Sequence, residues 1–384
     1  MHLGILTGGG DVPGLNSAIK AVVNEAFARG WTVTAFRRGW SGPLETDATD
    51  PQATPDSHFS LTPTFVRSIN RSGGTILHSS RTNPSRTKKA ALPPHVTRIV
   101  EHSDAGYVDA TGHVLAVIEK MKVDVLIAIG GDDTLSYAAR LHEEGAPTMC
   151  IPKTMDNDVF GTDYCIGFST CNTRSVEMIH RLRTAAGSHE RFLIVEMFGR
   201  NCGMTALAAG FLSDADRTLI AEVPFDLERL GELMTRDRNA NPSNYAVCVV
   251  SEGAMVAGED IIEKGEADAY GHKKLGGIGE RVGVGLKEVT GTDMMIQNLG
   301  YLLRSGPPDA VDLTVAKNFG TMAVQLIADG KTGLMMAIND GHYATRPANI
   351  STQGILRVNV DAMYDAENYR PTISSVLGST MYLR

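Results

Sequence analysis

Carboxylates, a lysine and paired glycines gather at the ends of two apolar runs in this chain. The first run, residues 125–129, is rich in β-branched side chains and ends in Gly-Gly-Asp-Asp-Thr. The second begins at residue 151 and continues as Pro-Lys-Thr-Met-Asp-Asn-Asp to residue 158. Each run predicts a buried parallel strand, and the paired glycines predict a turn of the size that holds a phosphate. Because loops at the carboxyl ends of parallel strands meet at one crevice, we expect up to four carboxylates and one lysine around a single pocket.

A second glycine turn lies near the amino terminus. Residues 3–7 predict a short strand, Gly8–Gly10 follow, and apolar residues at helical spacing predict a helix over residues 16–29. This order favours phosphate binding, because backbone N–H groups can approach an anion and the helix dipole attracts it. Taken alone, the turn is also compatible with simple chain reversal. A G-x-G-x-x-G dinucleotide site is excluded, since Pro13 stands where the last glycine is required.

Five segments together resemble the phosphofructokinase family, in the family's order and over most of the chain. They are residues 6–16, 125–134, 151–158, 161–168 and 191–203. The resemblance implies an α/β fold of two Rossmann-like three-layer α/β/α domains, with largely parallel sheets and an active site in the cleft between the domains.

The resemblance also predicts how the chain is divided. The phosphoryl-donor domain, for pyrophosphate and Mg²⁺, is expected to comprise residues 1–168 and about 305–355. The sugar-phosphate domain is expected to comprise residues 169–304 and a tail of about 356–384. A chain of 384 residues is long enough to give two such domains a core each.

Two consecutive aspartates close the central glycine turn. A carboxylate at the end of a phosphate loop can hold Mg²⁺ against phosphoryl oxygens, and we assign this role to Asp132. The alternative is that Asp132 caps a helix that begins near Thr134, although Asp133 or Thr134 can supply that cap instead.

Asp133 and Lys153 indicate the phosphoryl donor. Both positions resemble the pyrophosphate-dependent branch of the family, whereas ATP-dependent members commonly have glycine at each. A carboxylate about 4 Å from an α-phosphate costs roughly 4 kcal/mol at an effective dielectric constant near 20. A lysine ammonium at the second position pairs with pyrophosphate and stabilises charge on the leaving phosphate. Both residues therefore favour pyrophosphate and exclude ATP.

Thr154, Asp156 and Asp158 resemble the family's catalytic loop. Asp156 matches the general base that takes the proton of the sugar's C1 hydroxyl as it attacks the phosphoryl group. Thr154 and Asp158 are expected to orient the substrate and to contact metal or phosphate. A solvated turn is the alternative for an Asp-Asn-Asp run. The other residues that the resemblance assigns to phosphate binding or catalysis are Gly9, Gly10, Arg81, Gly131, Lys153 and Arg200.

The sugar-phosphate acceptor is expected to contact residues of the second half. Arg191 matches an arginine that reaches across a subunit boundary to the sugar's 6-phosphate, which implies a homodimer or homotetramer. Phe198, Gly199 and Arg200 resemble a Met-Gly-Arg loop in which phenylalanine replaces methionine. Glu252 stands where the family has a glutamate that hydrogen-bonds sugar hydroxyls.

The last site segment departs from the family pattern. Arg304 matches an arginine that binds the 6-phosphate, but Tyr301 replaces the neighbouring histidine. Met295 stands where a second subunit-crossing arginine is expected. Fructose 6-phosphate is the expected acceptor, and these departures leave another sugar phosphate, such as sedoheptulose 7-phosphate, as an alternative.

Composition restricts the remaining possibilities. A formal net charge of −8 without a long basic run argues against a nucleic-acid surface. The five cysteines show no C-x-x-C spacing, which predicts a reduced, cytoplasmic protein without structural zinc. We expect no signal peptide, because the amino terminus enters a predicted strand at once, and no membrane partner, because no apolar run reaches about 18 residues.

Three other functions make different demands on the same residues. An ATP-dependent enzyme would require the Asp133 carboxylate to turn away from the donor. NAD and lipid kinases share the Gly-Gly-Asp motif but lack counterparts of residues 152–158 and 191–203. A non-catalytic regulatory protein would be expected to have lost Asp132 or Asp156, and both are present.

Four segments carry predictions of structure alone. Residues 41–63, rich in Pro, Asp and Thr, predict a surface excursion with little core potential. Residues 259–268 and 275–289 predict surface helices, and apolar spacing predicts an amphipathic helix over residues 309–328.

Overall fold

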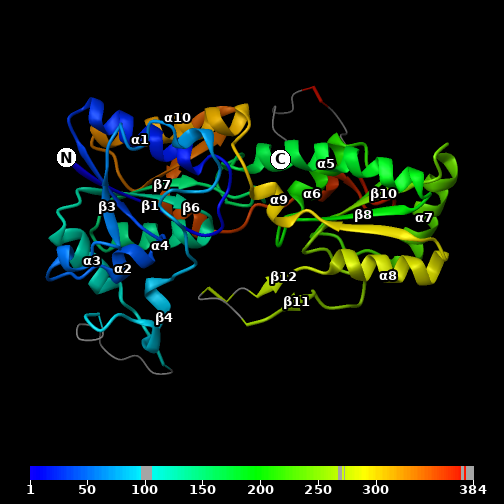
Figure 1. The fold of residues 1–384 in the computed structure, drawn as a ribbon, viewed down its shortest axis with the longest axis horizontal. Helices are drawn as coiled ribbons and strands as arrows, with labels where there is room; N and C mark the ends of the chain where they lie inside the picture. Colours follow the sequence, from blue (N-terminus) through cyan, green and yellow to red (C-terminus); the bar gives the residue numbers. More distant parts are fainter. Residues whose placement is uncertain (97–105, 267–269, 272, 373–375, 378–384) are drawn as a thin grey trace.

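The computed structural model describes the chain except for residues 97–105, 267–269, 272, 373–375 and 378–384. Two sheets lie along the long axis of the molecule, and helices cover both faces of each (Figure 1). The predicted α/β class with largely parallel sheets is therefore confirmed.

The first sheet has seven strands in the order β15-β14-β7-β6-β1-β2-β3. Their bounds are β1 His2–Thr7, β2 Thr32–Phe36, β3 His58–Leu61, β6 Val125–Gly130, β7 Thr148–Pro152, β14 Leu334–Asn339 and β15 His342–Pro347. The inner strands run parallel, whereas β3 and β15 pair antiparallel at the two edges. Every residue of β6 is buried, because helices cover both faces of the sheet at this strand.

Helices α1 (Leu15–Ala28) and α10 (Ala310–Ala328) cover one face of this sheet, and α3 (Thr111–Lys120) and α4 (Asp132–Glu143) cover the other (Figure 1). The α1–α10 contact is close because Gly320 has no side chain. A Cβ at Gly320 would lie 2.7 Å from the carbonyl oxygen of Ala18. The short helix α2 (Ser41–Glu45) lies beside α3.

The second sheet is fully parallel, with four strands in the order β13-β8-β10-β9. These are β8 Phe192–Met197, β9 Arg217–Leu219, β10 Ala246–Ser251 and β13 Met294–Asn298. Helices α5 (Phe168–Ser188) and α6 (Met204–Leu212) lie on one face, and α7 (Leu227–Ala240) and α8 (Ile278–Thr290) pack together on the other. All four strands therefore present their carboxyl ends at the same edge of the sheet, which faces the first sheet's loops.

Short elements complete the described chain. Three two-stranded ladders are β4 Thr87–Lys88 with β5 Tyr107–Val108, β11 Glu263–Lys264 with β12 Lys274–Leu275, and β16 Tyr364–Asp365 with β17 Arg370–Pro371. Short helices are α9 Gly300–Arg304 and α11 Val360–Met363, and 3-10 turns span Pro51–Ala53, Ile69–Arg71, Pro84–Arg86, Lys89–Ala91 and Ala348–Thr352.

Two predictions about connecting segments are wrong, and two are confirmed. Residues 41–63 contain α2 and the edge strand β3, and Leu61 is only 1% exposed, so this segment contributes to the core. The predicted helix at 259–268 is instead a loop leading into β11, as far as this segment is described. The helices predicted at 275–289 and 309–328 are α8 and α10.

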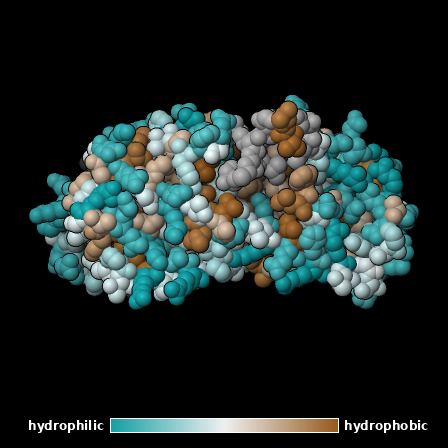
Figure 2. All heavy atoms as spheres, turned by 90° about the horizontal axis from the view of Figure 1, so that it is seen from above, coloured by the Kyte–Doolittle hydropathy of each residue, from teal (hydrophilic) through white to brown (hydrophobic). Residues whose placement is uncertain are grey.

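One hydrophobic cluster connects the two sheets. It runs from Ile5 in β1 through Ile166 and Phe168, at the start of α5, to Val195 in β8. The face seen from above is mostly hydrophilic, with hydrophobic residues scattered near its middle (Figure 2). In the part of the chain that is described, no helix is long and apolar enough to cross a bilayer.

Candidate active site

The amino-terminal glycine turn is held against two neighbouring segments. The N–H of Gly9 donates to the carbonyl oxygen of Ser80 at 3.0 Å, which brings the adjacent Arg81 to the pocket. Gly9 has φ of +75°, in the left-handed region, and a Cβ there would lie 3.3 Å from Nζ of Lys153. Glycine at position 9 therefore permits both the turn and the close approach of the lysine.

The central turn begins α4 two residues earlier than expected. Gly131 is the N-cap and makes no side-chain capping bond, so Asp132 and Asp133 occupy the first helical turn. Thr134, expected near the helix start, is 2% exposed and packs against Gly130. The alternative that Asp132 caps this helix is therefore wrong, and both aspartates line the pocket at a helix N-terminus.

Lys153 follows β7 and is almost completely enclosed, with 3% of its surface exposed. Its Nζ donates to the carbonyl oxygen of Gly10 at 2.6 Å. Burial, and next the nearby Arg304 guanidinium, lower the pKa of Lys153 to about 8. The Lys153 ammonium therefore lies in a site whose other groups do not fully balance its positive charge. Such a site favours an anionic ligand.

The conformation of the loop after Lys153 depends on Asn157, which was not among the predicted site residues. Asn157 is fully buried with φ of +55°, in the left-handed region that asparagine tolerates. Its amide donates to the carbonyl oxygen of Asp163 at 3.0 Å and accepts from the N–H of Cys165 at 2.8 Å. These bonds fix the chain between Asp156 and Asp158, and both carboxylates line the pocket.

The two loop carboxylates share a crowded, poorly solvated space. Burial, and next the Glu252 carboxylate, raise the pKa of Asp156 to about 6. Burial raises the pKa of Asp158 to about 7, and the carboxylates of Asp156 and Asp132 add to this shift. The backbone N–H of Arg200 donates to Asp156 at 3.4 Å, and the N–H of Asp156 donates to the hydroxyl of Thr154 at 3.2 Å.

The second sheet supplies the opposite wall. The guanidinium of Arg304 lies over the ring of Phe198, 4.5 Å from its centroid, and its Nη1 donates to the carbonyl oxygen of Asp11 at 3.1 Å. Arg304 therefore bridges the acceptor wall and the first glycine loop. Gly199 has φ of +130°, and its carbonyl accepts from the N–H of Gly253 at 3.1 Å, which joins the loops after β8 and β10.

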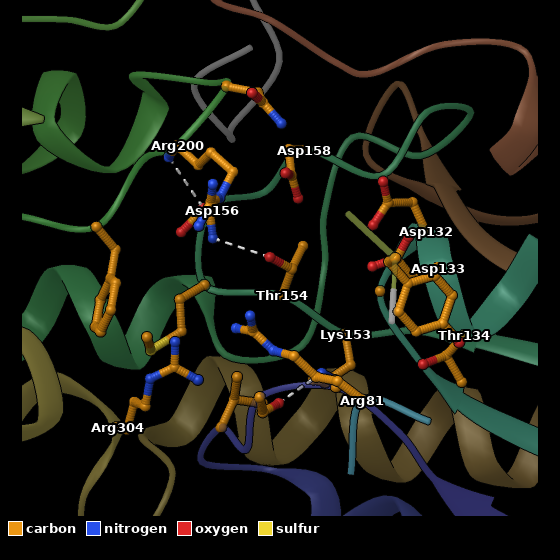
Figure 3. A pocket seen from close by; sticks show the side chains of 18 of the residues that line it. Arg81, Asp132, Asp133, Thr134, Lys153, Thr154, Asp156, Asp158, Arg200 and Arg304 are labelled. Atoms are coloured by element: carbon orange, nitrogen blue, oxygen red, sulfur yellow. Dashed lines mark hydrogen bonds between the residues drawn. The ribbon is translucent and has the colours of Figure 1, made fainter. Parts of the chain in front are cut away.

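Two cavities share this wall. A cavity of about 160 Å³ is lined by the glycine turns, four aspartates and several other polar residues. The aspartates are Asp132, Asp133, Asp156 and Asp158, and the other residues include Arg81, Lys153, Thr154 and Glu252. A larger cavity of about 870 Å³ adjoins it and is lined by Phe198, Arg200, Glu252, Tyr301 and Arg304 among others. Figure 3 shows Asp132 and Asp133 on one side of the smaller cavity and Arg304 on the other, with Lys153 and Thr154 between them.

Two positions from the sequence analysis lie away from these cavities. Arg191 precedes β8, at the opposite end of that strand from Phe198 and roughly 20 Å away along it. Met295 pairs with Leu193 in the edge strand β13 and packs against the core. Tyr301 does line the larger cavity but is 74% exposed.

Tyr270 lines the smaller cavity and was not singled out from the sequence. Its hydroxyl donates to the carbonyl oxygen of Thr82 at 3.0 Å, which ties the segment before β12 to the chain next to Arg81. No local signal marks this tyrosine, which lies between the two segments predicted as surface helices, residues 259–268 and 275–289.

The carboxylate oxygens of the aspartates that line the smaller cavity fit a hard divalent cation that also binds substrate. Among the described residues, no three His, Cys, Asp or Glu side chains form a ready metal cage. Asp132 and Asp158 nevertheless approach closely enough for one to raise the pKa of the other, so a cation would relieve their repulsion. Mg²⁺ commonly uses one or two carboxylates together with phosphate oxygens and water.

Comparison with known proteins agrees with this geometry. Pyrophosphate–fructose 6-phosphate 1-phosphotransferase from Amycolatopsis methanolica is 40% identical over 340 residues, 88% of this chain and 90% of the relative. An ATP-dependent 6-phosphofructokinase from Chloroflexus aggregans is 38% identical over 346 residues, 90% of this chain and 89% of the relative. The solved pyrophosphate-dependent phosphofructokinase from Marinobacter aquaeolei has the same fold, with a TM-score of 0.75 over 97% of this chain and 88% of that one at 18% identity. Since the Phosphofructokinase family model also matches residues 2–327, the chain belongs to the phosphofructokinase family.

Proposed function

We propose that this protein transfers a phosphoryl group from pyrophosphate to the C1 hydroxyl of fructose 6-phosphate, giving fructose 1,6-bisphosphate and phosphate. The observation that carries the choice of donor is the pair Asp133 and Lys153, which face one cavity of about 160 Å³. Pockets for drug-sized ligands, such as a nucleotide, span about 300–1,000 Å³. A small cavity with a carboxylate at one side and an enclosed lysine favours the compact inorganic donor.

Asp156 acts as the general base in this reaction. Burial, and next the Glu252 carboxylate, raise its pKa above the ordinary range of an aspartate, which makes the carboxylate a better acceptor for the C1 proton as the oxygen attacks. Thr154 and the Arg200 backbone N–H hold this carboxylate and its loop. Asp158, beside it, would help to hold a divalent cation near the phosphoryl group.

Positive groups stabilise the charge that develops on the transferred and leaving phosphates. Arg81 and the Lys153 ammonium line the same cavity as the glycine turns at Gly9, Gly10 and Gly131. The N-terminus of α4, which follows Gly131, favours an anion, and the enclosed lysine interacts more strongly than it would in water.

Family membership implies a divalent cation, and we propose Mg²⁺. Asp132 would hold it, with help from Asp158 and from phosphate oxygens of the donor. When bound, Mg²⁺ supplies charge neutralisation between the two phosphates.

The larger cavity receives the sugar phosphate. Arg200, Glu252 and Arg304 offer one carboxylate and two guanidinium groups, which match hydroxyls and a phosphate. Tyr301, Phe198 and Gly199 complete the binding segment. Arg191, which is distant from the cavities of its own chain, is proposed to reach the site of a second subunit in a homodimer or homotetramer.

The first sheet and its helices, residues 1–168 and about 305–355, are proposed as the donor domain. Residues 169–304 and the tail of about 356–384 are proposed as the acceptor domain, and the protein is proposed to work in the cytoplasm.

Formation of fructose 1,6-bisphosphate from pyrophosphate, fructose 6-phosphate and Mg²⁺ tests the proposal. Asp156→Asn keeps the shape of the loop and removes the base, so kcat should fall by about 10²–10⁴-fold while KM for pyrophosphate changes little. No product with the unaltered protein would refute the proposed reaction. An unchanged kcat in the variant would refute the role of Asp156.

A further inference from the structure

Glu196 is a buried carboxylate behind the acceptor wall. It lies near the end of β8, two residues before Phe198, and is 3% exposed. It belongs to the lining of neither cavity. A carboxylate in such a place must be satisfied by the protein itself, because burying it without partners is costly.

Its partners are N–H groups from two other segments. Oε2 accepts from the N–H of Gly279 at 2.7 Å and from the N–H of Gly277 at 3.1 Å. Oε1 accepts from the side-chain amide of Asn298 at 2.6 Å and from the N–H of Gly277 at 3.2 Å. The main chain adds to this, since the N–H of Leu299 donates to the carbonyl oxygen of Glu196 at 3.1 Å.

Glu196 thereby caps α8 from a distance. The N-cap of this helix is Gly277, with φ of +102° and no side chain to satisfy the first N–H groups. The carboxylate supplies the missing acceptor, and its negative charge matches the positive end of the helix dipole. The glycines keep room for it, because a Cβ at Gly279 would lie 3.1 Å from Oε2.

The segments joined at Glu196 are those that line the larger cavity. Asn298 and Leu299 line it directly and lead into α9, which ends in Arg304. Leu275, just before the capped glycines, also lines it, and the carbonyl oxygen of Lys273 accepts from Nη2 of Arg200 at 2.6 Å. One carboxylate thus connects the start of α8 and the end of β13 to strand β8, which leads into the loop with Phe198 and Arg200.

We infer that Glu196 is a positioning residue for the sugar phosphate, holding Arg304 and Arg200 in register without touching the substrate. The inference rests on the proposed function for the identity of the acceptor. It predicts an asymmetric defect. Losing the carboxylate loosens the acceptor wall, while the donor loops after β1, β6 and β7 have no bond to it.

Glu196→Gln tests this with little change of shape. The amide group presents N–H₂ to one of the N–H donors, so at least one bond and the charge are lost. The Kd of fructose 6-phosphate by titration calorimetry and its KM should both rise about tenfold, since a misplacement of 1 Å can cost up to about 100-fold. The KM for pyrophosphate should stay within about twofold. Asn298→Ala removes one hydrogen bond to Glu196, so it should raise the Kd and KM of fructose 6-phosphate by a smaller factor.

Asp226→Asn is the matched control. Asp226 caps α7 in the same half of the molecule by accepting from the N–H of Arg229 at 2.7 Å, away from both cavities. It should leave every binding constant unchanged. Unaltered sugar-phosphate affinity in Glu196→Gln, or an equal rise in KM for both substrates, would overturn the inference. If the unaltered protein binds fructose 6-phosphate but transfers nothing from pyrophosphate, the proposed reaction fails, whereas the ratio of Kd values still decides the role of Glu196. Absence of any sugar-phosphate binding would overturn both.

Discussion

At Lys153 the fold encloses an ammonium group beside other cations. Its Nζ contacts the carbonyl oxygen of Gly10, and Arg304 and Arg81 contribute to lowering its pKa, after burial, to about 8. A lowered pKa in a basic group means that the charged form exists below about pH 8 and is lost above it. Because the donor is an anion, the cationic form is the productive one.

The pH dependence of kcat/KM for pyrophosphate follows from the loss of the Lys153 charge above its lowered pKa. We expect kcat/KM to fall about tenfold per pH unit above the Lys153 pKa, since this ratio reports the free enzyme. Lys153→Arg should carry the activity, at a lower level, to higher pH, because a guanidinium stays protonated. Lys20→Arg, on the surface of α1, is the control and should leave the profile unchanged. A profile that stays flat to pH 9.5 in the unaltered protein would contradict the role of Lys153.

Asn157 combines a left-handed backbone with a buried amide, and the two contributions can be separated. Asn157→Gly keeps the backbone and loses the amide bonds, so the free energy of unfolding should fall by roughly 1–3 kcal/mol. Asn157→Ala adds the strain of a left-handed alanine and should cost roughly 1–2 kcal/mol more. Urea unfolding followed by circular dichroism gives both values. Alanine no worse than glycine would show that φ at this position is unimportant.

The residues proposed to contact phosphate could be predicted from the sequence, whereas the residues that hold them in place mostly could not. Asp132, Asp133 and Lys153 follow apolar strands directly, so topology alone brings them together. Asn157 and Glu196 act through hydrogen-bond partners that are distant in sequence or on another loop, and no local sequence pattern predicts such partners. Tyr270 reaches the pocket from the connection between two segments that were expected to form surface helices.

At the scale of elements, periodic segments were predicted well and short strands were not. Helices α8 and α10 have apolar residues at helical spacing, which determines both their type and their buried face. Strand β3 has four residues and a polar flank, so its sequence resembles a loop. Its structure arises from pairing with β2, and Leu61 is buried because that pairing turns it toward the core.

A buried ion pair joins β9 to α7 in the second half. Arg217 is fully buried and donates to both carboxylate oxygens of Asp237 at 2.6 and 2.7 Å. Asp237→Ala leaves the guanidinium without its main counter-charge, so the free energy of unfolding should fall by about 3–5 kcal/mol. Thermal and urea unfolding measure this directly.

The exposed pair Glu259–Arg281 is the comparison for that variant. Glu259→Ala should leave the unfolding midpoint unchanged, because water screens a surface pair. Equal effects of the two substitutions would contradict the dependence on burial.

At the scale of the whole molecule, the site exists because two parallel sheets present their carboxyl ends to one another. The first sheet brings three glycine or carboxylate loops to this junction, and the second brings the loops that carry Arg200, Glu252 and Arg304. The α/β architecture follows from alternating strand and helix patterns. The volumes of the two cavities depend on how side chains from both sheets fill the junction, which no sequence pattern reports.

The central claim is that the small cavity selects pyrophosphate through Asp133 and Lys153. Initial rates with fructose 6-phosphate and Mg²⁺, with pyrophosphate or ATP supplied in parallel, test it on the unaltered protein and on Asp133→Gly. We expect activity with pyrophosphate alone in the unaltered protein. In the variant, kcat/KM for ATP should rise at least about tenfold, because a repulsion of roughly 4 kcal/mol is removed. Efficient use of ATP by the unaltered protein would contradict the selection of pyrophosphate by Asp133 and Lys153.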